Sequence, residues 1–350
     1  GDTLVDHHVH IVGLGNSRSG IEVHDDMQSM IHPFKLTRFK YFMDAAGVDD
    51  NTRADEQYLE SLLDQIEQVP VHLKVMGLAM DRHYLENGEV DPGETEIYIP
   101  NQYIADLSQQ HPNRILPAIS VHPYRPDAVK QLEYWASQGI RVVKWIPNAM
   151  GIDPSSELCE SFYETMHRLD LILLSHAGTE QAVDSQGRQH LGNPLLLRKP
   201  LDMGVTVIVA HCAVSGNSKD TDDPERSSVP NFDLFMRLFD GPQYEGILFA
   251  DISAMTLLNQ VGSPLEVILS RSDLHSRLLY ASDYPLPAVG VLNNNTALGY
   301  LGFLDDAILP ALEEIQKFNP LLYNLVLTRS LKHPESGAQF SEDLFRNRIP

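Results

Sequence analysis

The sequence predicts a (β/α)₈ barrel, and three observations support this fold class. Short apolar runs rich in β-branched residues alternate with amphipathic stretches of about ten or more residues, a pattern typical of repeated βα units around a parallel sheet. There are eight such apolar runs, the number of strands that closes around a core of side chains. A chain of 350 residues, 43% of them hydrophobic, is long enough to bury that core in one domain.

The predicted strands follow one another along the first 283 residues. They cover residues 4–10, 73–80, 115–121, 142–147, 171–176, 205–211, 247–252 and 278–283. Helical patterns separate them, among others at residues 57–69, 128–138, 157–169 and 232–239. Pro126 and Asp127 open the second of these helices and Gly139 ends it, which is ordinary helix punctuation.

Two long polar segments, residues 16–35 and 82–100, follow the first and second predicted strands. In a barrel this position is the catalytic mouth, so they are either lids and substrate-binding loops or insertions without a function. After Asp283 the pattern predicts two or three helices and a polar tail. We therefore expect a single domain over residues 1–350, with a C-terminal helical extension over about residues 290–350.

The composition limits the binding partners and the cellular compartment that we expect. With 26 Lys+Arg against 48 Asp+Glu, the formal charge of −22 disfavours binding to nucleic acid or to an anionic membrane surface. The two cysteines, Cys159 and Cys212, are too few for a disulfide framework. There is neither an apolar run of about 18 residues nor a signal-peptide pattern, so we expect a cytoplasmic protein that acts on a small molecule.

The first predicted strand ends in the run Asp6-His7-His8-Val9-His10. His8 and His10 are two residues apart, so their side chains point to the same side of the strand and can reach one metal ion. Neutral imidazole is a common ligand of divalent ions and an unusual filler of an apolar layer. The motif alone is only moderately specific, and two core histidines are the alternative.

Further polar side chains stand at or near the ends of four later predicted strands. They are Lys144 on the fourth, His176 on the fifth, His211 on the sixth and Asp283 on the eighth. The C-terminal ends of barrel strands meet at the mouth, where such enzymes carry their chemistry. Five strands that contribute His, Lys and Asp at one level predict a metal site.

This order of residues resembles the amidohydrolase superfamily. The phrases Val209-Ala210-His211-Cys212 and Ala281-Ser282-Asp283-Tyr284-Pro285 resemble in particular the branch that includes aminocarboxymuconate-semialdehyde decarboxylase. As in that branch, the first expected ligands come within the first ten residues of this sequence, so we expect no flanking β-sandwich. Relatives in this branch are often dimers, so a homodimer is one expected assembly.

The resemblance gives each residue an expected role. Zn²⁺ is the expected cofactor, with other divalent metals as alternatives, and His8, His10, His176 and Asp283 are its expected ligands. The ion would bring the pKa of a bound water to about 7. Asp283 is the expected general base, and His211 is placed to hydrogen-bond the oxygen that gains charge.

Lys144 separates two versions of the site. In binuclear relatives this lysine is carboxylated and bridges two ions, with His176 and His211 on the second ion. Carboxylation requires a neutral amine, which burial favours. In the mononuclear branch a lysine at this position need not be modified, and it could instead balance the charge of an acidic neighbour or of the substrate. Because the flanking phrases resemble that branch, we favour one metal and keep two with a carboxylated Lys144 as the alternative.

Other residues are expected to lie near the mouth of the barrel but belong to no recognisable motif. His122 is expected to face the mouth or lie in a surface loop, and His7, which points away from His8, is expected to pack or support. The remaining candidates near the mouth are Asp81, Arg82, Asp251, Ser253, Lys35, Arg38 and Lys40. The last three could bind a substrate carboxylate, although solvated helix charges are the simpler interpretation.

Three functions remain open at this point. The leading one is hydrolysis of an amide, ester or lactone by a metal-activated hydroxide. The first alternative is non-oxidative decarboxylation of an aromatic or unsaturated carboxylic acid on the same scaffold. The second is a catalytically inactive metal-binding barrel, which the retained Asp283 and His211 disfavour.

Overall fold

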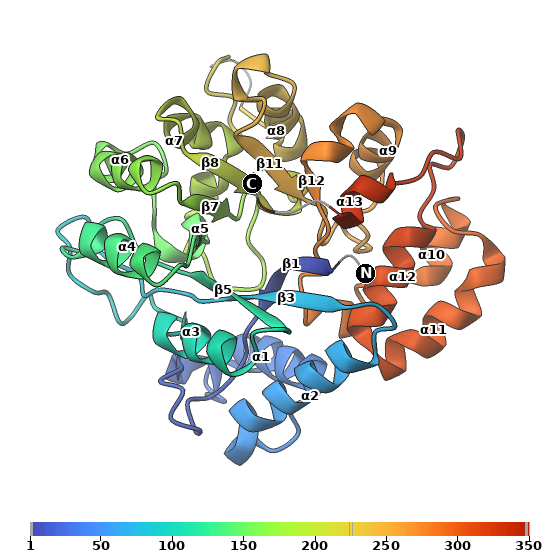
Figure 1. The fold of residues 1–350 in the computed structure, drawn as a ribbon, viewed down its shortest axis with the longest axis horizontal. Helices are drawn as coiled ribbons and strands as arrows, with labels where there is room; N and C mark the ends of the chain where they lie inside the picture. The colour runs from blue at the N-terminus through green and yellow to red at the C-terminus, as the bar shows by residue number, and fades with distance from the viewer. Residues whose placement is uncertain (1–2, 224, 226, 347–348, 350) are drawn as a thin grey trace.

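The computed structural model describes residues 3–223, 225, 227–346 and 349. Its main sheet holds eight strands in the order β1, β3, β5, β6, β7, β8, β11 and β12, and each pairs in parallel with its neighbour. Their bounds are β1 Leu4–His10, β3 Leu73–Leu78, β5 Ile115–Ile119, β6 Val142–Trp145, β7 Ile172–Ser175, β8 Thr206–Val209, β11 Leu248–Asp251 and β12 Leu278–Leu279. All eight lie within the predicted runs, and they occupy the centre of Figure 1.

The sheet closes between its last and first strands. Regular pairing of β12 stops at Leu279, but the segment that follows still bonds to β1. Asp283 N donates to His8 O at 3.0 Å, and His10 N donates to Tyr284 O at 2.9 Å. The predicted (β/α)₈ barrel is therefore confirmed, with an eighth strand that is shorter than expected.

Helices surround the strands, as Figure 1 shows. Those between consecutive barrel strands are α1 Pro33–Ala45, α2 Ala54–Gln68, α3 Asn101–Gln110, α4 Ala128–Ser137, α5 Pro147–Met150, α6 Glu160–Arg168, α7 Arg198–Asp202, α8 Asn231–Phe239 and α9 Ser263–Ser270. The four predicted helices correspond to α2, α4, α6 and α8. Asp127 is the N-cap residue of α4, and Gly139, with φ of 81°, follows its end. No helix in the described part of the chain is long and apolar enough to cross a membrane.

The C-terminal segment holds more helices than the two or three expected. Four are described: α10 Asn295–Tyr300, α11 Leu309–Phe318, α12 Pro320–Ser330 and α13 Glu342–Arg346. The first and last have six and five residues, too short for an amphipathic pattern to reveal them. α12 packs against α2, and α13 packs against β1 and β12, so this extension covers one flank of the barrel.

The two long polar segments meet over the mouth of the barrel. β2 Glu22–Val23 pairs antiparallel with β4 Ile97–Tyr98, which joins the segment after β1 to the segment after β3. A second short ladder, β9 Asn217–Ser218 with β10 Val229–Pro230, lies in the segment after β8. The first ladder contributes Val23 and Ile97 to the wall of the cavity described below. The interpretation as substrate-binding loops fits this placement better than an insertion without a function.

Alternation along the strands decides which side chains face the barrel interior. A cluster of buried apolar residues fills it: Met76, Leu78, Ala118, Val142, Ile172, Leu174, Ile208, Ala210 and Leu279. Because the side-chain period of a strand is two, Lys144 follows Val142 inward, and His176 follows Ile172 and Leu174 inward. The apolar layer therefore ends in polar groups at the carboxyl ends of the strands.

Candidate metal centre and active-site cavity

A cavity of about 330 Å³ opens at the carboxyl ends of the barrel strands. Its lining includes all six residues that the sequence singled out: His8, His10, Lys144, His176, His211 and Asp283. The other lining residues are mostly apolar and come from α1, from the β2–β4 ladder and from the segments after β7, β11 and β12. The fold thus brings residues from five strand ends into one chamber.

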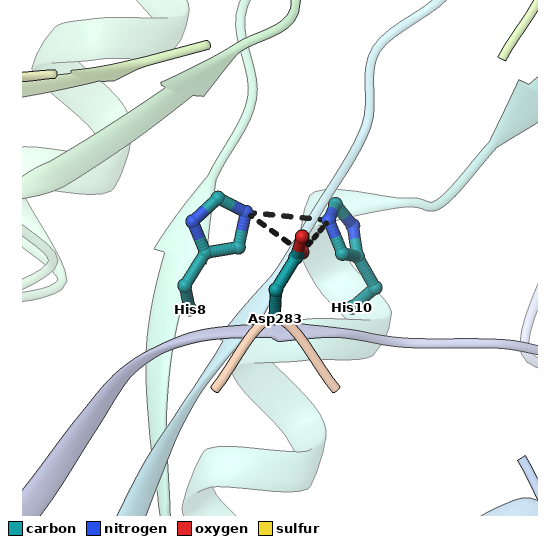
Figure 2. Close-up of side chains that lie close together, drawn as sticks. All are labelled: His8, His10 and Asp283. Atoms are coloured by element: carbon teal, nitrogen blue, oxygen red, sulfur yellow. Dashed lines mark hydrogen bonds and ion pairs between the residues drawn. The ribbon is translucent and has the colours of Figure 1, made fainter. Parts of the chain in front are cut away.

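Three of these side chains converge on one point, as Figure 2 shows. His8 Nε2 lies 3.2 Å from His10 Nε2. Asp283 Oδ1 lies 3.1 Å from His10 Nε2 and 3.6 Å from His8 Nε2. His8 is fully buried, and Asp283 is nearly so. Burial alone would raise the pKa of Asp283, but His211, His8 and His10 hold it well below its usual range, so the carboxylate is ionised.

The donor set at this point fits a divalent cation. Asp283 Oδ1 is buried and accepts no hydrogen bond. Burial lowers the pKa of His8 to about 3, so this imidazole is neutral and has a lone pair to share. Two imidazole nitrogens and a carboxylate oxygen that face one another match the ligand types that Zn²⁺ takes in catalytic sites.

Asp251, the last residue of β11, is a buried carboxylate beneath this group. Its Oδ2 lies 2.9 Å from His8 Nδ1. Its Oδ1 accepts from His211 N at 2.9 Å, from Ser253 N at 3.1 Å and from the Ser253 hydroxyl. Burial would raise the pKa of Asp251, but His8, His211 and Ser253 together hold it well below its usual range. His8, His211 and Asp251 form a second group of possible ligand atoms. The hydrogen bonds of Asp251 account for their proximity, so no metal ion is needed to explain it.

His211 reaches the cavity by a route that differs from the prediction. The predicted strand included His211, but β8 ends at Val209. Ile208 and Ala210 point inward, so an extended chain would direct His211 outward. Instead His211, Cys212 and Ala213 have φ values of 58°, 48° and 51°, which turn the chain back toward the mouth. Left-handed backbone at non-glycine residues is costly and is retained where the surroundings enforce it.

His176 presents a free ring nitrogen to the same chamber. Its Nδ1 lies 3.5 Å from Glu180 Oε2, and its buried Nε2 has no hydrogen-bond partner among the described residues. Burial lowers the pKa of His176 to about 4, so this imidazole is also neutral. Its ring centroid lies 5.3 Å from that of His211. The ring is therefore available as a further ligand, although it stands apart from the convergent group of three.

Lys144 lies against the centre of the site. Its Nζ is 3.3 Å from His8 Nε2, and the side chain is buried. Burial lowers the pKa of Lys144 to about 8, against the attraction of Asp251, Asp283 and Glu180. A neutral fraction of this amine is thus accessible near physiological pH, as carboxylation would require.

Several weaker candidates lie away from the cavity. His122 is fully buried, with Nε2 2.9 Å from Met150 O, so the expectation that it faces the mouth or a surface loop is wrong. Asp81 accepts from His122 N at 2.8 Å and pairs with Arg125. These groups contact one another and do not line the cavity.

The remaining cations and His7 take structural positions. Arg82 pairs with Glu22, Lys35 pairs with Glu96, and Lys40 is exposed. His7 Nδ1 lies 3.0 Å from Tyr280 O, on the side of β1 away from His8. Arg38 is the one member of this group that lines the cavity.

Asp251, Ser253 and Glu180 contact the histidines of the site, a role that the sequence did not indicate. The first two were singled out by position alone, as residues at and after the end of the seventh barrel strand. Glu180 was not predicted, although it follows His176 by four residues and lies close to its ring. An acidic residue four positions after a candidate ligand is a signal that could have identified it.

A family profile described as amidohydrolase matches residues 5–230. The chain belongs to this amidohydrolase family. It is thus an enzyme of that family with a (β/α)₈ fold, and its cluster of imidazole and carboxylate groups lies where amidohydrolase barrels carry their chemistry. No protein of curated function matches the sequence significantly.

Three solved structures show the same fold as this amidohydrolase. An uncharacterised TIM-barrel protein from Bordetella bronchiseptica has a TM-score of 0.53 and 15% identity, covering 93% of this chain and 99% of that one. The 5-carboxyvanillate decarboxylase from Sphingomonas paucimobilis has a TM-score of 0.52 and 10% identity, covering 99% and 100%. The 5-carboxyvanillate decarboxylase from Novosphingobium aromaticivorans, solved with bound manganese, has a TM-score of 0.50 and 13% identity, covering 81% and 88%.

Proposed function

We propose that this protein is a metal-dependent hydrolase that cleaves an amide, ester or lactone bond. The observation that carries the proposal is the convergence of His8 Nε2, His10 Nε2 and Asp283 Oδ1 at the mouth of an amidohydrolase barrel. We take Zn²⁺ as the cofactor, with His176 as a fourth ligand, because imidazole and carboxylate are its usual partners in catalytic sites. Manganese and other divalent ions are the alternatives.

A divalent ion held by these residues would supply hydroxide near neutral pH, because it lowers the pKa of water to about 7. The protein's own groups then manage protons. Asp283 accepts a proton from the attacking water through its carboxylate and delivers it to the leaving group. The apolar wall formed by Phe39, Phe42 and Met43 on α1 excludes bulk water from the reacting groups.

To donate a hydrogen bond to a developing oxyanion, as expected, His211 must be protonated on both ring nitrogens. Ser253 donates its hydroxyl proton to Asp251, so the Ser253 oxygen, 2.7 Å from His211 Nδ1, accepts from that ring nitrogen. Neutral His211 therefore carries its proton on Nδ1, and its Nε2 is an acceptor. It can donate a hydrogen bond to a developing oxyanion through Nε2 only as imidazolium. As a neutral ring it can serve as a base or as a ligand.

The test compares hydrolysis with CO₂ release. Purified protein is stripped with a chelator, reloaded with Zn²⁺ or Mn²⁺, and assayed against panels of esters, lactones, amides and aromatic carboxylic acids. We expect hydrolysis that depends on the metal and is lost in D283N, with the fold retained. CO₂ release without hydrolysis would contradict the proposal in favour of a decarboxylase, and metal binding without turnover of any compound would favour an inactive barrel.

Two further expectations carry over from the sequence. Cytoplasmic residence is proposed from the two cysteines, both of which are buried and free. We propose one metal ion per chain instead of two. Two groups of three possible ligand atoms occur among the described residues. His8, His10 and Asp283 all line the cavity, whereas the second group includes Asp251, which does not. A homodimer and the division into a single domain remain predictions.

A further inference from the structure

Asp251 contacts two of the imidazoles at the site but lies beneath the cavity and is not part of its lining. The side chain is fully buried at the end of β11. One oxygen, Oδ2, lies 2.9 Å from His8 Nδ1. The other, Oδ1, accepts from His211 N, Ser253 N and the Ser253 hydroxyl. A single carboxylate thus receives four hydrogen bonds on its two oxygens.

These bonds determine where the protons lie on two rings. An ionised carboxylate only accepts hydrogen bonds, so His8 must carry its proton on Nδ1. The lone pair of His8 is then on Nε2, the atom that faces His10 Nε2 and Asp283 Oδ1. At His211 the same carboxylate acts through Ser253: the hydroxyl gives its proton to Asp251 and accepts the Nδ1 proton of the ring.

We propose that Asp251 is a positioning residue that selects the Nδ1–H tautomer of both His8 and His211. Each ring then offers its Nε2 as an acceptor or ligand, which the site requires for metal binding by His8. Asp251 also holds the amide of His211 in its left-handed turn, so that the ring reaches the cavity. The metal-binding part of this inference rests on the proposed function, whereas the tautomers are properties of the metal-free protein.

The carboxamide of D251N provides a sharp test because it is nearly isosteric. It has one acceptor oxygen, and three donors, from His211 and Ser253, surround the Oδ1 position. The oxygen of Asn therefore settles there, and its NH₂ group faces His8 Nδ1. His8 must then accept on Nδ1 and carry its proton on Nε2, where it can no longer bind an ion.

The experiment first measures tautomers in metal-free protein by ¹⁵N NMR of histidine-labelled samples, with His8 assigned by comparison with H8Q. We expect wild-type His8 as the Nδ1–H tautomer and D251N His8 as the Nε2–H tautomer. The second measurement is Zn²⁺ affinity by competition with a chromophoric chelator. We expect D251N to bind about 10- to 100-fold more weakly.

Matched variants separate this role from general stability. Asp55 is also a buried carboxylate that accepts from backbone amides and serine hydroxyls, at Leu14 N and Ser19 Oγ among others, and it contacts none of the ligands. D55N should keep the wild-type tautomer and affinity. S253A should release the His211 proton from Nδ1 while leaving His8 unchanged.

Two results would overturn the inference. One is the Nε2–H tautomer at His8 in the wild-type protein, a result that needs no variant to fold. The other is wild-type Zn²⁺ affinity in a folded D251N. Absence of hydrolysis in the wild type would contradict the proposed function but leave the tautomer assignment standing, so the two failures are distinguishable.

Discussion

Arg38 Nη2 lies 2.9 Å from Glu96 Oε2, so this carboxylate neutralises the charge of Arg38. Among the described residues that line the cavity, the only other Lys or Arg is Lys144. Glu96 is almost fully buried, and its other oxygen lies 2.8 Å from Lys35 Nζ. Asp184 N also donates to Glu96 Oε2 at 2.8 Å. Glu96 thus joins α1 to the segment after β7, and no described Lys or Arg at the rim of the largely apolar chamber is left without a partner.

This pairing predicts a preference for uncharged substrates. E96Q should release Arg38 and raise kcat/KM for an ester that carries a carboxylate, relative to its neutral homologue, by about tenfold, or ~1.4 kcal/mol. Steady-state kinetics on matched neutral and anionic esters measure this ratio. E133Q, which removes an exposed pair with Arg168, is the control and should not change it. An unchanged ratio in E96Q would show that the pair does not govern selectivity.

The aromatic side chains of α1 should contribute binding energy for an apolar substrate. Phe42 lines the cavity, whereas Phe34 on the same helix is 90% exposed. F42S should raise KM by roughly tenfold or more, because burial of such a ring stabilises by about 1.5–3 kcal/mol. Metal content should not change. F34S is the matched control, and an equal effect of both variants would indicate loss of helix structure instead of a lost contact.

Stability should fall in acid partly because of His122. The neutral ring accepts from Tyr124 N at 3.2 Å and lies 2.9 Å from Met150 O, and burial lowers the pKa of His122 to about 3. Unfolded histidine has a pKa near 6.5, so between about pH 6.5 and pH 3 the unfolded state binds the extra proton. The free energy of unfolding should therefore decrease as pH falls through this window, by about 1.4 kcal/mol per pH unit for this group.

Denaturant titrations of wild type and H122Q between pH 7 and pH 4 test this prediction. H122Q should be less stable at pH 7 but show a shallower decline toward acid. His275, buried with Nε2 2.9 Å from Ile268 O, offers a comparison variant, H275Q, elsewhere in the barrel. Parallel pH profiles of wild type and H122Q would refute the assignment of this slope to His122.

Lys144 provides a prediction about the number of metals. With one ion per chain, Lys144 carries no carboxyl group, and native mass spectrometry should show the unmodified mass with a single metal. K144Q should then retain Zn²⁺ binding, because His8, His10 and Asp283 converge without a contribution from its Nζ. Additional mass equal to one CO₂, together with two metals per chain, would contradict the single-ion site.

The strand pattern and the identity of six cavity residues could be predicted because both follow from period-two alternation and from the common position of strand ends. The route of His211 could not be predicted, because the three left-handed residues that follow Ala210 include no glycine to reveal the turn. The burial of His122 and the roles of Asp251 and Glu96 depend on contacts between segments far apart in the sequence. Short helices such as α10 and α13 were similarly invisible to periodicity.

Anomalous diffraction at the zinc absorption edge, from crystals of the Zn²⁺-loaded protein, tests the proposed metal site most directly. We expect one strong peak per chain, bounded by His8 Nε2, His10 Nε2 and the carboxylate of Asp283. A peak bounded instead by His8 Nδ1, Asp251 and His211, or a cavity without any peak at saturating Zn²⁺, would contradict the proposed site.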